Sequence, residues 1–415
     1  MDYTLYPRHD VICIDMRSFY ASVEAVKRGL DPMKVMLAVV GDPNRSGSII
    51  LAASPMLKTT YGLSNVSRFF DLPKDPNIHV VPASMGDYVN ISIAITKLLL
   101  KYVPQEAIHV YSIDETWITV NGLEKSFGTR RQIAELIQRD IFNTFGLTCS
   151  IGIGDNKFLA KVVMDLYAKK ESIAECRYED VETKLWPFPV EKIWGIGRRM
   201  QHNLNRMGIV TLAQLANFNL NVLKKRFGVI GEQLYWHAWG IDLSPVFGNF
   251  LKSEQKGFGH GITLLRDYSK DEVATCILDL CEEVCRRARM EHKVGKTIQL
   301  GIGYTQDAGG GFSRSRSTMP TNITKEVYDI CMTLFKEFYD GVSNIRRVSI
   351  TLGNLYNDDD LQLDLFNDKS KQKDIGHIMD DIRAKYGDTA ILRASSFTDN
   401  GITIERSKKI GGHYA

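Results

Sequence analysis

Residues 11–175 alternate short runs rich in valine and isoleucine with longer stretches of helical apolar spacing, and this alternation restricts the folds open to the chain. The second helical stretch is expected to begin with Asp155 as its N-cap. Strands and helices in this order favour an α+β fold with a split βαβ sheet over a parallel doubly wound sheet. Strands are predicted at 11–15, 36–41, 48–54, 108–120 and 147–154, and helices at 86–103 and 155–170.

The rest of the chain divides where the pattern changes. Residues 176–245 are predicted to be helical, and residues 246–256 lack periodicity and are predicted to be a linker. From 257 to 355, four strand-like runs bracket two helical stretches, which predicts a second, smaller α/β unit. Beyond it we expect a polar tail, interrupted by the apolar pentapeptide QLDLF at 362–366.

The composition places the chain in a broad class. With 415 residues, of which 44% are hydrophobic, it should form about three domains of roughly 150 residues each. The formal net charge is only +3, so a nucleic-acid-binding surface would be a local patch. We expect neither a secretory signal nor a membrane span, because no apolar run approaches the ~18 residues that a span needs. Seven cysteines without a CxxC pair favour reduced thiols in the cytoplasm.

Three acidic residues stand where predicted strands end or break. Asp15 ends the first strand, and Asp114 and Glu115 interrupt the run at 108–120. Any one of them alone would be read as a turn former or a helix cap. Together, buried carboxylates repel one another unless cations neutralise them, and Mg²⁺ prefers such oxygen ligands. The three residues therefore predict a two-Mg²⁺ site for in-line phosphoryl transfer, without a Walker A loop.

An aromatic pair, Phe19 and Tyr20, follows Asp15 by about one helical turn. The start of that helix would present backbone N–H groups to a triphosphate. The Tyr20 ring could lie under the sugar and exclude a ribose 2′-hydroxyl, which would select deoxynucleotides. The periodicity alone is equally compatible with a core tyrosine on an amphipathic helix.

Four ordered segments carry a family resemblance: IDMRSFYASVE, YSIDE, GIGDNKFLAK and WGIGRRMQHNLNRMGI. They resemble the Y-family translesion DNA polymerases, in particular the UmuC-like branch of Gram-positive bacteria and their phages, from about residue 10 to 366. The resemblance implies a right-hand α+β polymerase that extends primers past damaged bases in DNA repair and the SOS response. The implied domains are a palm at 1–29 and 85–175, fingers at 30–84, a helix-hairpin-helix thumb at 176–245, a linker at 246–256, a little finger at 257–357 and a tail at 358–415.

The resemblance also implies site residues. The two Mg²⁺ ions would be bound by Asp15, the carbonyl of Met16, Asp114 and Glu115, and Tyr20 would be the steric gate. The residues themselves leave two alternative functions open: another two-metal nucleotidyl transferase or cyclase, and a catalytically dead DNA-binding protein. The presence of all three carboxylates argues against the second alternative.

The triphosphate contacts depart from the family pattern. In the fingers, Met56 and Thr59 stand where many members have a tyrosine and a basic residue, and Lys58 lies one position away. Lys169 is the expected phosphate-binding cation, although its register is shifted by one against the family. The predicted nucleotide-binding residues are Phe19, Tyr20, Lys58, Thr59 and Lys169.

Two regions are predicted to hold the phosphate backbone of DNA. In the thumb, two short helices around a glycine turn would present N–H groups and arginines without reading bases. In the second sheet, Arg314 and Arg316 alternate with serines and would share one face, although a solvated face is the ordinary alternative. The predicted DNA-binding residues are Gly195, Gly197, Arg198, Arg199, Gly208, Arg314 and Arg316, with Arg206, Arg346 and Arg347 as further candidates.

The pentapeptide in the tail resembles the peptide by which bacterial polymerases dock on the sliding clamp. Gln362 would fill a polar subsite, and Leu363, Leu365 and Phe366 would fill an apolar pocket. Folding back onto the protein is the alternative. The expected partners are thus primer-template DNA, deoxynucleoside triphosphates and the clamp, for a cytoplasmic monomer without a membrane partner.

Overall fold

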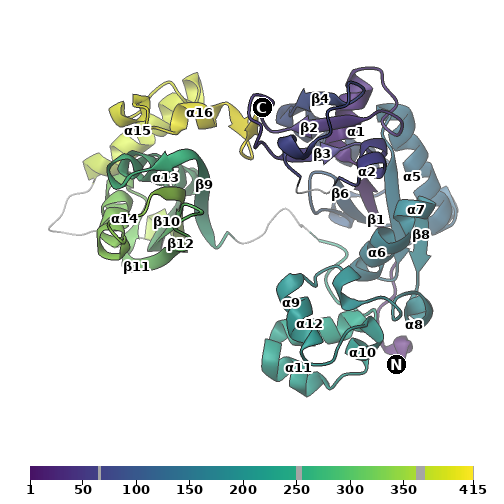
Figure 1. The fold of residues 1–415 in the computed structure, drawn as a ribbon. Coiled ribbons are helices and arrows are strands. Elements are labelled where there is room, and N and C mark those ends of the chain that lie inside the picture. The colour runs from purple at the N-terminus through teal and green to yellow at the C-terminus, as the bar shows by residue number, and fades with distance from the viewer. Residues whose placement is uncertain (64–66, 249–254, 361–369, 415) are drawn as a thin grey trace. The chain divides into compact units, whose positions relative to one another are not determined.

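The computed structural model describes residues 1–63, 67–248, 255–360 and 370–414, shown in Figure 1. The chain forms two compact units: Met1–Lys252 with His413–Ala415, and Ser253–Gly412. Among the described residues, no helix combines the length and the apolar character that crossing a bilayer requires.

The first unit is built on a five-stranded sheet in the order β5-β6-β1-β7-β8. Strand β1 is antiparallel to both of its neighbours, whereas β7 and β8 are parallel. The predicted strands of this sheet are confirmed. The sequence pattern did not reveal β8, which is only four residues long and contains Glu175, or the strand His79–Pro82 in the fingers region. The strands are β1 (Val11–Met16), β5 (Ile108–Val110), β6 (Glu115–Thr119), β7 (Cys149–Gly154) and β8 (Ile173–Cys176).

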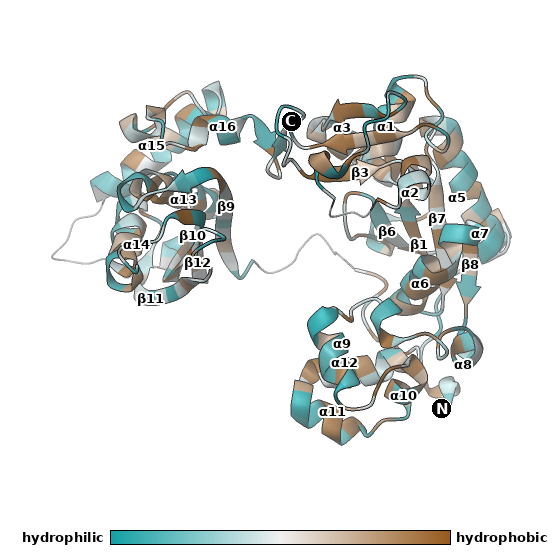
Figure 2. Ribbon diagram, in the orientation of Figure 1, coloured by the Kyte–Doolittle hydropathy of each residue, from teal (hydrophilic) through white to brown (hydrophobic). Residues whose placement is uncertain are grey.

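Helices cover both faces of this sheet, because apolar side chains of its strands point alternately to one face and to the other. Ile12 and Ile14 face a core shared with α1 (Phe19–Lys27), α3 (Met85–Leu99) and α5 (Arg130–Phe145). Val11, Cys13 and Trp117 face the opposite core, which α6 (Lys157–Val163) covers. Figure 2 shows hydrophobic residues along β1 and α6. The sheet is thus enclosed between two apolar layers.

The start of α6 differs from the prediction. Asn156, not Asp155, is the N-cap, and its side chain accepts a hydrogen bond from the Leu159 N–H at 2.9 Å. Asp155 is fully buried and pairs with Arg177 at 2.7 Å, while also accepting the N–H of Tyr178. Both residue types cap helices well, so local preference could not decide between adjacent positions. After α6 the helix continues as a π-helical segment, η4 (Met164–Ala168), and then α7 (Lys169–Glu171).

The predicted fingers region contains a small sheet of its own, in the order β3-β2-β4. Its core is small, formed around Val40, Ile50 and Leu57. The elements are β2 (Leu37–Val40), β3 (Ile50–Ala53), α2 (Pro55–Tyr61) and β4 (His79–Pro82).

The predicted thumb region is helical, as expected, and shares the core beneath α6: Phe158 of α6 lies in the same apolar cluster as Leu204 and Leu215. The first residues of the predicted linker are held on the palm, because the Val246 carbonyl accepts a hydrogen bond from Thr119 Oγ1 at 2.9 Å. The remainder, 249–254, lies outside the described residues. The thumb helices are α8 (Val181–Lys184), α9 (Arg198–Asn205), α10 (Leu212–Ala216), α11 (Leu220–Phe227) and α12 (Val229–Ala238).

The second unit contains a four-stranded antiparallel sheet in the order β11-β10-β12-β9, with two helices on one face. The four strands and both helices agree with the predicted runs. They are β9 (Gly257–Tyr268), α13 (Lys270–Met290), β10 (Lys293–Tyr304), β11 (Gly311–Thr321), α14 (Thr324–Phe338) and β12 (Ile345–Asn357).

The predicted polar tail is instead folded onto this unit. Residues 370–412 belong to it and include α15 (Ser370–Tyr386) and α16 (Thr403–Ser407). Buried ion pairs attach α15 to α13: Arg289 contacts Asp380 at 2.6 Å, and Arg383 contacts Glu282 at 3.1 Å. Apolar periodicity cannot reveal a contact made by charged side chains, which explains why the sequence indicated a free tail.

Candidate active site

The three predicted catalytic carboxylates meet at one end of the palm sheet. The register of β1 with β6 places Asp15 directly opposite Glu115. The N–H of Met16 donates to the carbonyl of Asp114 at 2.9 Å, so the turn before β6 lies against the end of β1. Ser112 Oγ donates to Asp114 Oδ1 at 2.6 Å and orients that carboxylate. Residues 100 positions apart in the sequence are thereby joined by strand pairing.

A buried cation lies among these acids, and the sequence analysis missed it. Lys161 Nζ is 2.8 Å from Glu115 Oε2 and 3.9 Å from Asp15 Oδ2, and its side chain is 7% exposed. It also contacts Asp165 at 3.3 Å. Burial lowers the Lys161 pKa, but the Glu115 hydrogen bond and the Asp165 and Glu115 charges outweigh it and raise the pKa. The available signal was a lysine within the apolar run FLAKVV.

The pKa of Asp15 is raised chiefly because its carboxyl is buried. Burial raises this pKa to about 6, the charges of Lys169 and Lys161 oppose the rise, and repulsion from Asp114 and Glu115 adds to it. Within the described part of the chain, no three Asp, Glu, His or Cys side chains form a ready metal cage. The donor chemistry nevertheless fits a divalent cation, because carboxylates and the Met16 carbonyl are hard oxygen ligands. A bound divalent cation would neutralise carboxylate charge that the Lys161 ammonium group now balances.

The predicted steric gate lies beside the carboxylates. The Tyr20 ring is stacked on Tyr88, with centroids 4.4 Å apart and planes at 13°. Tyr88 in turn donates from its hydroxyl to the buried Glu24 at 2.9 Å, so the supporting ring is fixed. Burial and, to a smaller extent, the charge of Asp114 raise the Tyr20 pKa. Phe19 is 3% exposed in the core, so only its backbone is available to a nucleotide.

Of the predicted triphosphate cations, Lys58 and Lys169 reach the site. Lys58 Nζ is 3.3 Å from Ser18 Oγ at the start of α1. Burial lowers the pKa of Lys58, and the positive charge of Lys169 lowers it further, so the two lysines face a common space. Thr59 lies on the exposed side of α2, where its hydroxyl donates to the Pro55 carbonyl at 2.9 Å.

A π-helical segment, η4, directly precedes Lys169. Lys169 pairs with Asp165 at 3.1 Å, and Asp165 also contacts Lys161 at 3.3 Å. The charge of Lys169 lowers the pKa of Asp15, so Lys169 belongs to the charged groups around the site.

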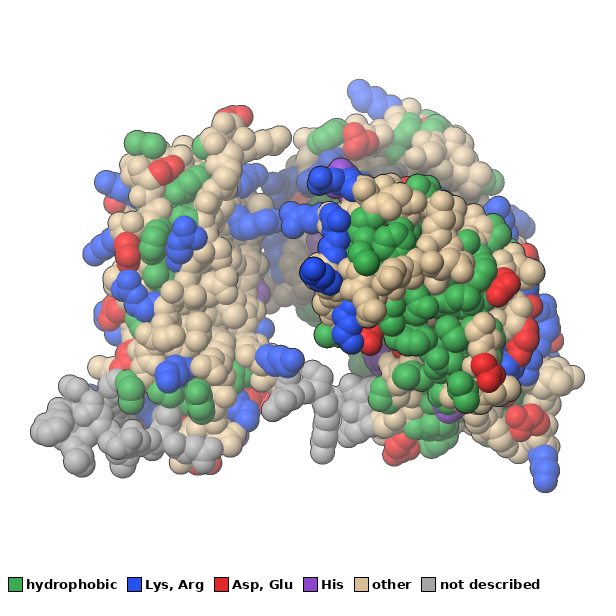
Figure 3. All heavy atoms as spheres, turned by 90° about the horizontal axis from the view of Figure 1, so that it is seen from below, with side chains coloured by type: hydrophobic (Ala, Val, Ile, Leu, Met, Phe, Trp, Pro, Cys, Tyr) green, Lys and Arg blue, Asp and Glu red, His purple; other side chains and the backbone are tan. Residues whose placement is uncertain are grey.

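The glycines and arginines of the thumb hairpin are exposed together. Gly195 and Gly208 adopt φ of 91° and 79°, a region that favours glycine, and Gly197 is the N-cap of α9. Arg198 and Arg199 are exposed in the first turn of α9. Figure 3 shows Lys and Arg side chains along one edge of the thumb, next to an apolar patch. The hairpin thus has the exposed donors that the sequence predicted.

The arginines of the second sheet, Arg314 and Arg316, lie on the face that the helices cover, whereas binding along a DNA backbone would favour the open face. Arg314 is paired across the strands with Leu300, so it points to the side covered by α14. Its guanidinium lies 5.0 Å from the Phe338 ring centroid, and Arg316 pairs with Glu337 at 2.7 Å. Alternation correctly predicted a shared face but could not tell which face the helices cover. The open face instead carries Gln299, Ser313, Ser315, Arg347, Ser349 and Thr351.

The predicted clamp-binding residues Gln362, Leu363, Leu365 and Phe366 lie outside the described residues, so their role stays a prediction.

Models of known protein families match three parts of the chain. The impB/mucB/samB family matches residues 14–165, and the C-terminal domain of that family matches 255–365. A DNA polymerase-iota thumb domain matches residues 191–242.

Two relatives from Bacillus subtilis (strain 168) cover nearly the whole chain. UvrX, whose name refers to UV-damage repair, is 48% identical over 100% of this chain and 99% of its own. DNA polymerase IV 2 is 41% identical over 97% of this chain and 98% of its own. A solved Y-family DNA polymerase chimera, 24% identical, shares the fold with a TM-score of 0.67 over 84% of this chain and 99% of its own. The chain therefore belongs to the impB/mucB/samB family and is a UmuC-like, Y-family translesion DNA polymerase.

Proposed function

We propose that this polymerase performs nucleotidyl transfer at Asp15, Asp114 and Glu115, with two Mg²⁺ ions held by these carboxylates and the Met16 carbonyl. The observation that carries the proposal is the register that sets Asp15 opposite Glu115, beside Tyr20 and the two lysines. Bound Mg²⁺ ions would activate the primer 3′-hydroxyl and offset charge on the phosphates. The hydroxyl oxygen would form a bond to the α-phosphorus of the incoming nucleotide as the bond to pyrophosphate breaks.

Each surrounding residue has a distinct part in this proposal. Lys58 and Lys169 bind the triphosphate oxygens, which compensates for the absence of a basic side chain at position 59. Tyr20, held flat by Tyr88, excludes a ribose 2′-hydroxyl by contact. Lys161 keeps Glu115 in place and screens the acids from one another.

The DNA and its partners are bound elsewhere on the chain. The exposed glycines and arginines of the thumb hairpin would hold phosphates without regard to sequence. In the second unit, Arg347 on the open face of the sheet is a better candidate for the duplex than Arg314 and Arg316. We further propose that the polymerase acts as a cytoplasmic monomer in the SOS response and is recruited by the sliding clamp through residues 362–366.

A pair of isosteric substitutions tests the assignment of the carboxylates. Asp114→Asn with Glu115→Gln should abolish primer extension on a template with an abasic site, because the ligand charge is lost. Affinity for primer-template should persist, since the thumb supplies the phosphate contacts. Glu135→Gln on the exposed side of α5 is the matched control and should extend normally. Extension by the folded double variant would show that these acids are not the catalytic ligands.

A further inference from the structure

Three aromatic rings from separate segments meet where the palm joins the thumb. Tyr111 lies in the turn between β5 and β6, Trp117 lies on β6, and Trp194 precedes α9. The Tyr111 ring centroid is 4.9 Å from Trp117 and 6.1 Å from Trp194, and the two tryptophans are 6.0 Å apart. All three contacts are edge-to-face, an arrangement that favours ring packing. We call these three residues the aromatic wall.

The members of the aromatic wall differ sharply in exposure. Trp117 is 3% exposed and donates its indole N–H to the Lys157 carbonyl at 3.1 Å, so it is part of the fold. Trp194 is half-buried. Tyr111 is 52% exposed and rests on both tryptophans. The tryptophans thus form a rigid base that presents the Tyr111 ring to solvent.

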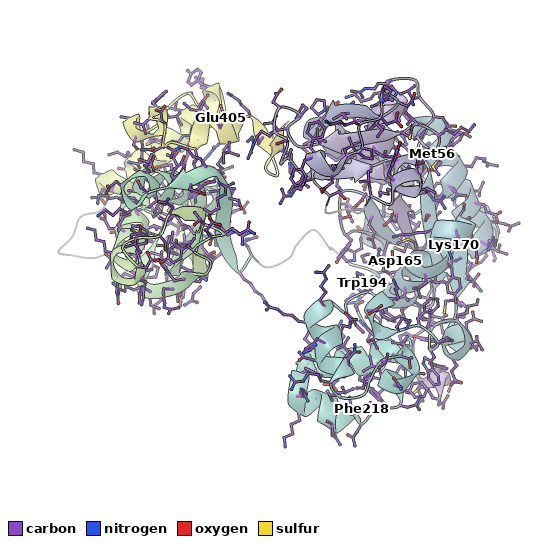
Figure 4. The ribbon with its side chains drawn as sticks, in the orientation of Figure 1. Met56, Asp165, Lys170, Trp194, Phe218 and Glu405 are labelled. Atoms are coloured by element: carbon purple, nitrogen blue, oxygen red, sulfur yellow. The ribbon has the colours of Figure 1, made fainter. Side chains whose placement is uncertain are left out.

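The position of Tyr111 matters more than its exposure, because single exposed aromatic residues are common. Its N–H donates to the Glu115 carbonyl at 3.0 Å, so it lies across the turn from the catalytic acids. On the other side, Trp194 is followed immediately by Gly195, the first glycine of the thumb hairpin. Figure 4 shows Trp194 at the junction of palm and thumb, beside α9. The ring therefore lies between the acids and the phosphate-binding hairpin.

A primer strand must pass this point if it is held by the thumb hairpin and ends at the acids. We infer that Tyr111, supported by Trp117 and Trp194, is a contact surface for the 3′-terminal nucleotide of the primer, packing against its sugar and base. This inference rests on the proposed function and adds a primer-binding residue to it. A flat ring accepts any base, as a polymerase that works on all sequences requires.

The contact predicts a specific loss on substitution. Removing an aromatic platform costs about 1–3 kcal/mol per base, so Tyr111→Ala should raise the primer-template concentration for half-maximal extension on the order of tenfold. Tyr111→Phe keeps the ring and should stay within about twofold of the wild type. Tyr111→Leu preserves apolar packing on Trp117 without a flat face and should resemble Tyr111→Ala. Tyr386→Ala, at a tyrosine 68% exposed in the other unit, is the control and should have no effect.

Binding to a duplex of the same length that is closed at both ends by hairpin loops separates primer contact from a bracing role. Each Tyr111 variant should bind the closed duplex as tightly as the wild type, because it has no 3′ end. An equal loss of affinity for closed and recessed duplexes would mean that Tyr111 only braces the thumb, and the inference would be overturned. Wild-type behaviour of Tyr111→Ala or Tyr111→Leu on the recessed duplex would also overturn it.

A crosslinking experiment tests the contact without relying on activity. With p-benzoylphenylalanine in place of Tyr111, irradiation of the bound primer-template should label the last two nucleotides of the primer strand. Labelling of the template strand alone, or of neither strand, would refute the inference. If the wild-type chain extended no primer, the proposed function would fail, whereas primer crosslinking would still support the contact at Tyr111.

Discussion

Replacing Lys161 by methionine should destabilise the first unit and make its stability depend on Mg²⁺. The lysine Nζ lies 2.8 Å from Glu115 and 3.3 Å from Asp165. Removing one partner of a buried ion pair costs about 3–5 kcal/mol, because the other charge stays buried. Most of the lost stability should come from the Glu115 pair, because the Glu115 side chain is only 9% exposed. The side chains of Asp15 and Asp165 are 23% and 24% exposed, so water screens their charges.

Mg²⁺ should then recover part of the loss. A cation bound only by the folded state stabilises it by about 2.7 kcal/mol at a hundredfold excess over its Kd. The variant needs that charge more than the wild type does, so its denaturant midpoint should shift further between EDTA and Mg²⁺. Primer extension in Mg²⁺ should also fall, because Glu115 has lost the group that orients it.

The measurement is denaturant unfolding of the wild type and the variant, each with EDTA and with Mg²⁺. Lys170→Met removes the same charge from an exposed position on α7, marked in Figure 4, and should change the free energy of unfolding by less than about 0.5 kcal/mol. A Lys161→Met variant as stable as the wild type in EDTA would refute the reasoning. So would an equal Mg²⁺ shift for both proteins.

Four further outcomes follow from the structure. Tyr20→Ala should raise the ratio of ribo- to deoxynucleotide insertion by an order of magnitude. Tyr88→Leu should raise the same ratio by roughly twofold to tenfold, because the stacked pair that it removes is worth about 0.5–1.5 kcal/mol. Parallel insertion assays with both nucleotides decide this. Gly152→Ala should lower the thermal midpoint and extension together, since the new Cβ would lie 2.0 Å from the Ala160 carbonyl oxygen and push α6 away. Glu282→Gln should weaken the second unit at neutral pH. Burial raises the Glu282 pKa, but three arginines outweigh burial and lower this pKa in the folded state. The carboxylate therefore stabilises the fold above its unfolded-state pKa, and this stabilisation is lost as pH falls through its folded-state pKa. Unfolding curves across pH should therefore converge for wild type and variant at acid pH. Alanines at 362, 363 and 366 should leave synthesis on short templates unchanged and remove stimulation by loaded clamp on long ones; loss on both templates would place the peptide in the folded core.

The sequence by itself indicated most strands of the first sheet, the elements of the second unit and the kind of chemistry that the three carboxylates support. Alternation and turn residues are local properties, so β1, β7 and α9 could be read directly. Carboxylates at the ends of two such strands indicated phosphoryl transfer before any contact was known. The exposed glycine hairpin of the thumb was likewise visible, because glycine is needed at Gly195 and Gly208 for backbone reasons.

Only the tertiary structure decided how distant segments meet. Lys161 stands within an apolar run, which gives no sign of a charged contact. The register of the strands places Glu115 and Asp15 next to its ammonium group. Because α14 covers one side of the second sheet, Arg314 lies away from the open face. Residues 370–412 are docked by charged pairs together with the buried Ile402. These outcomes depend on which surfaces become buried together, and the energy of a buried charge is set by partners far away in the chain, which no local pattern records.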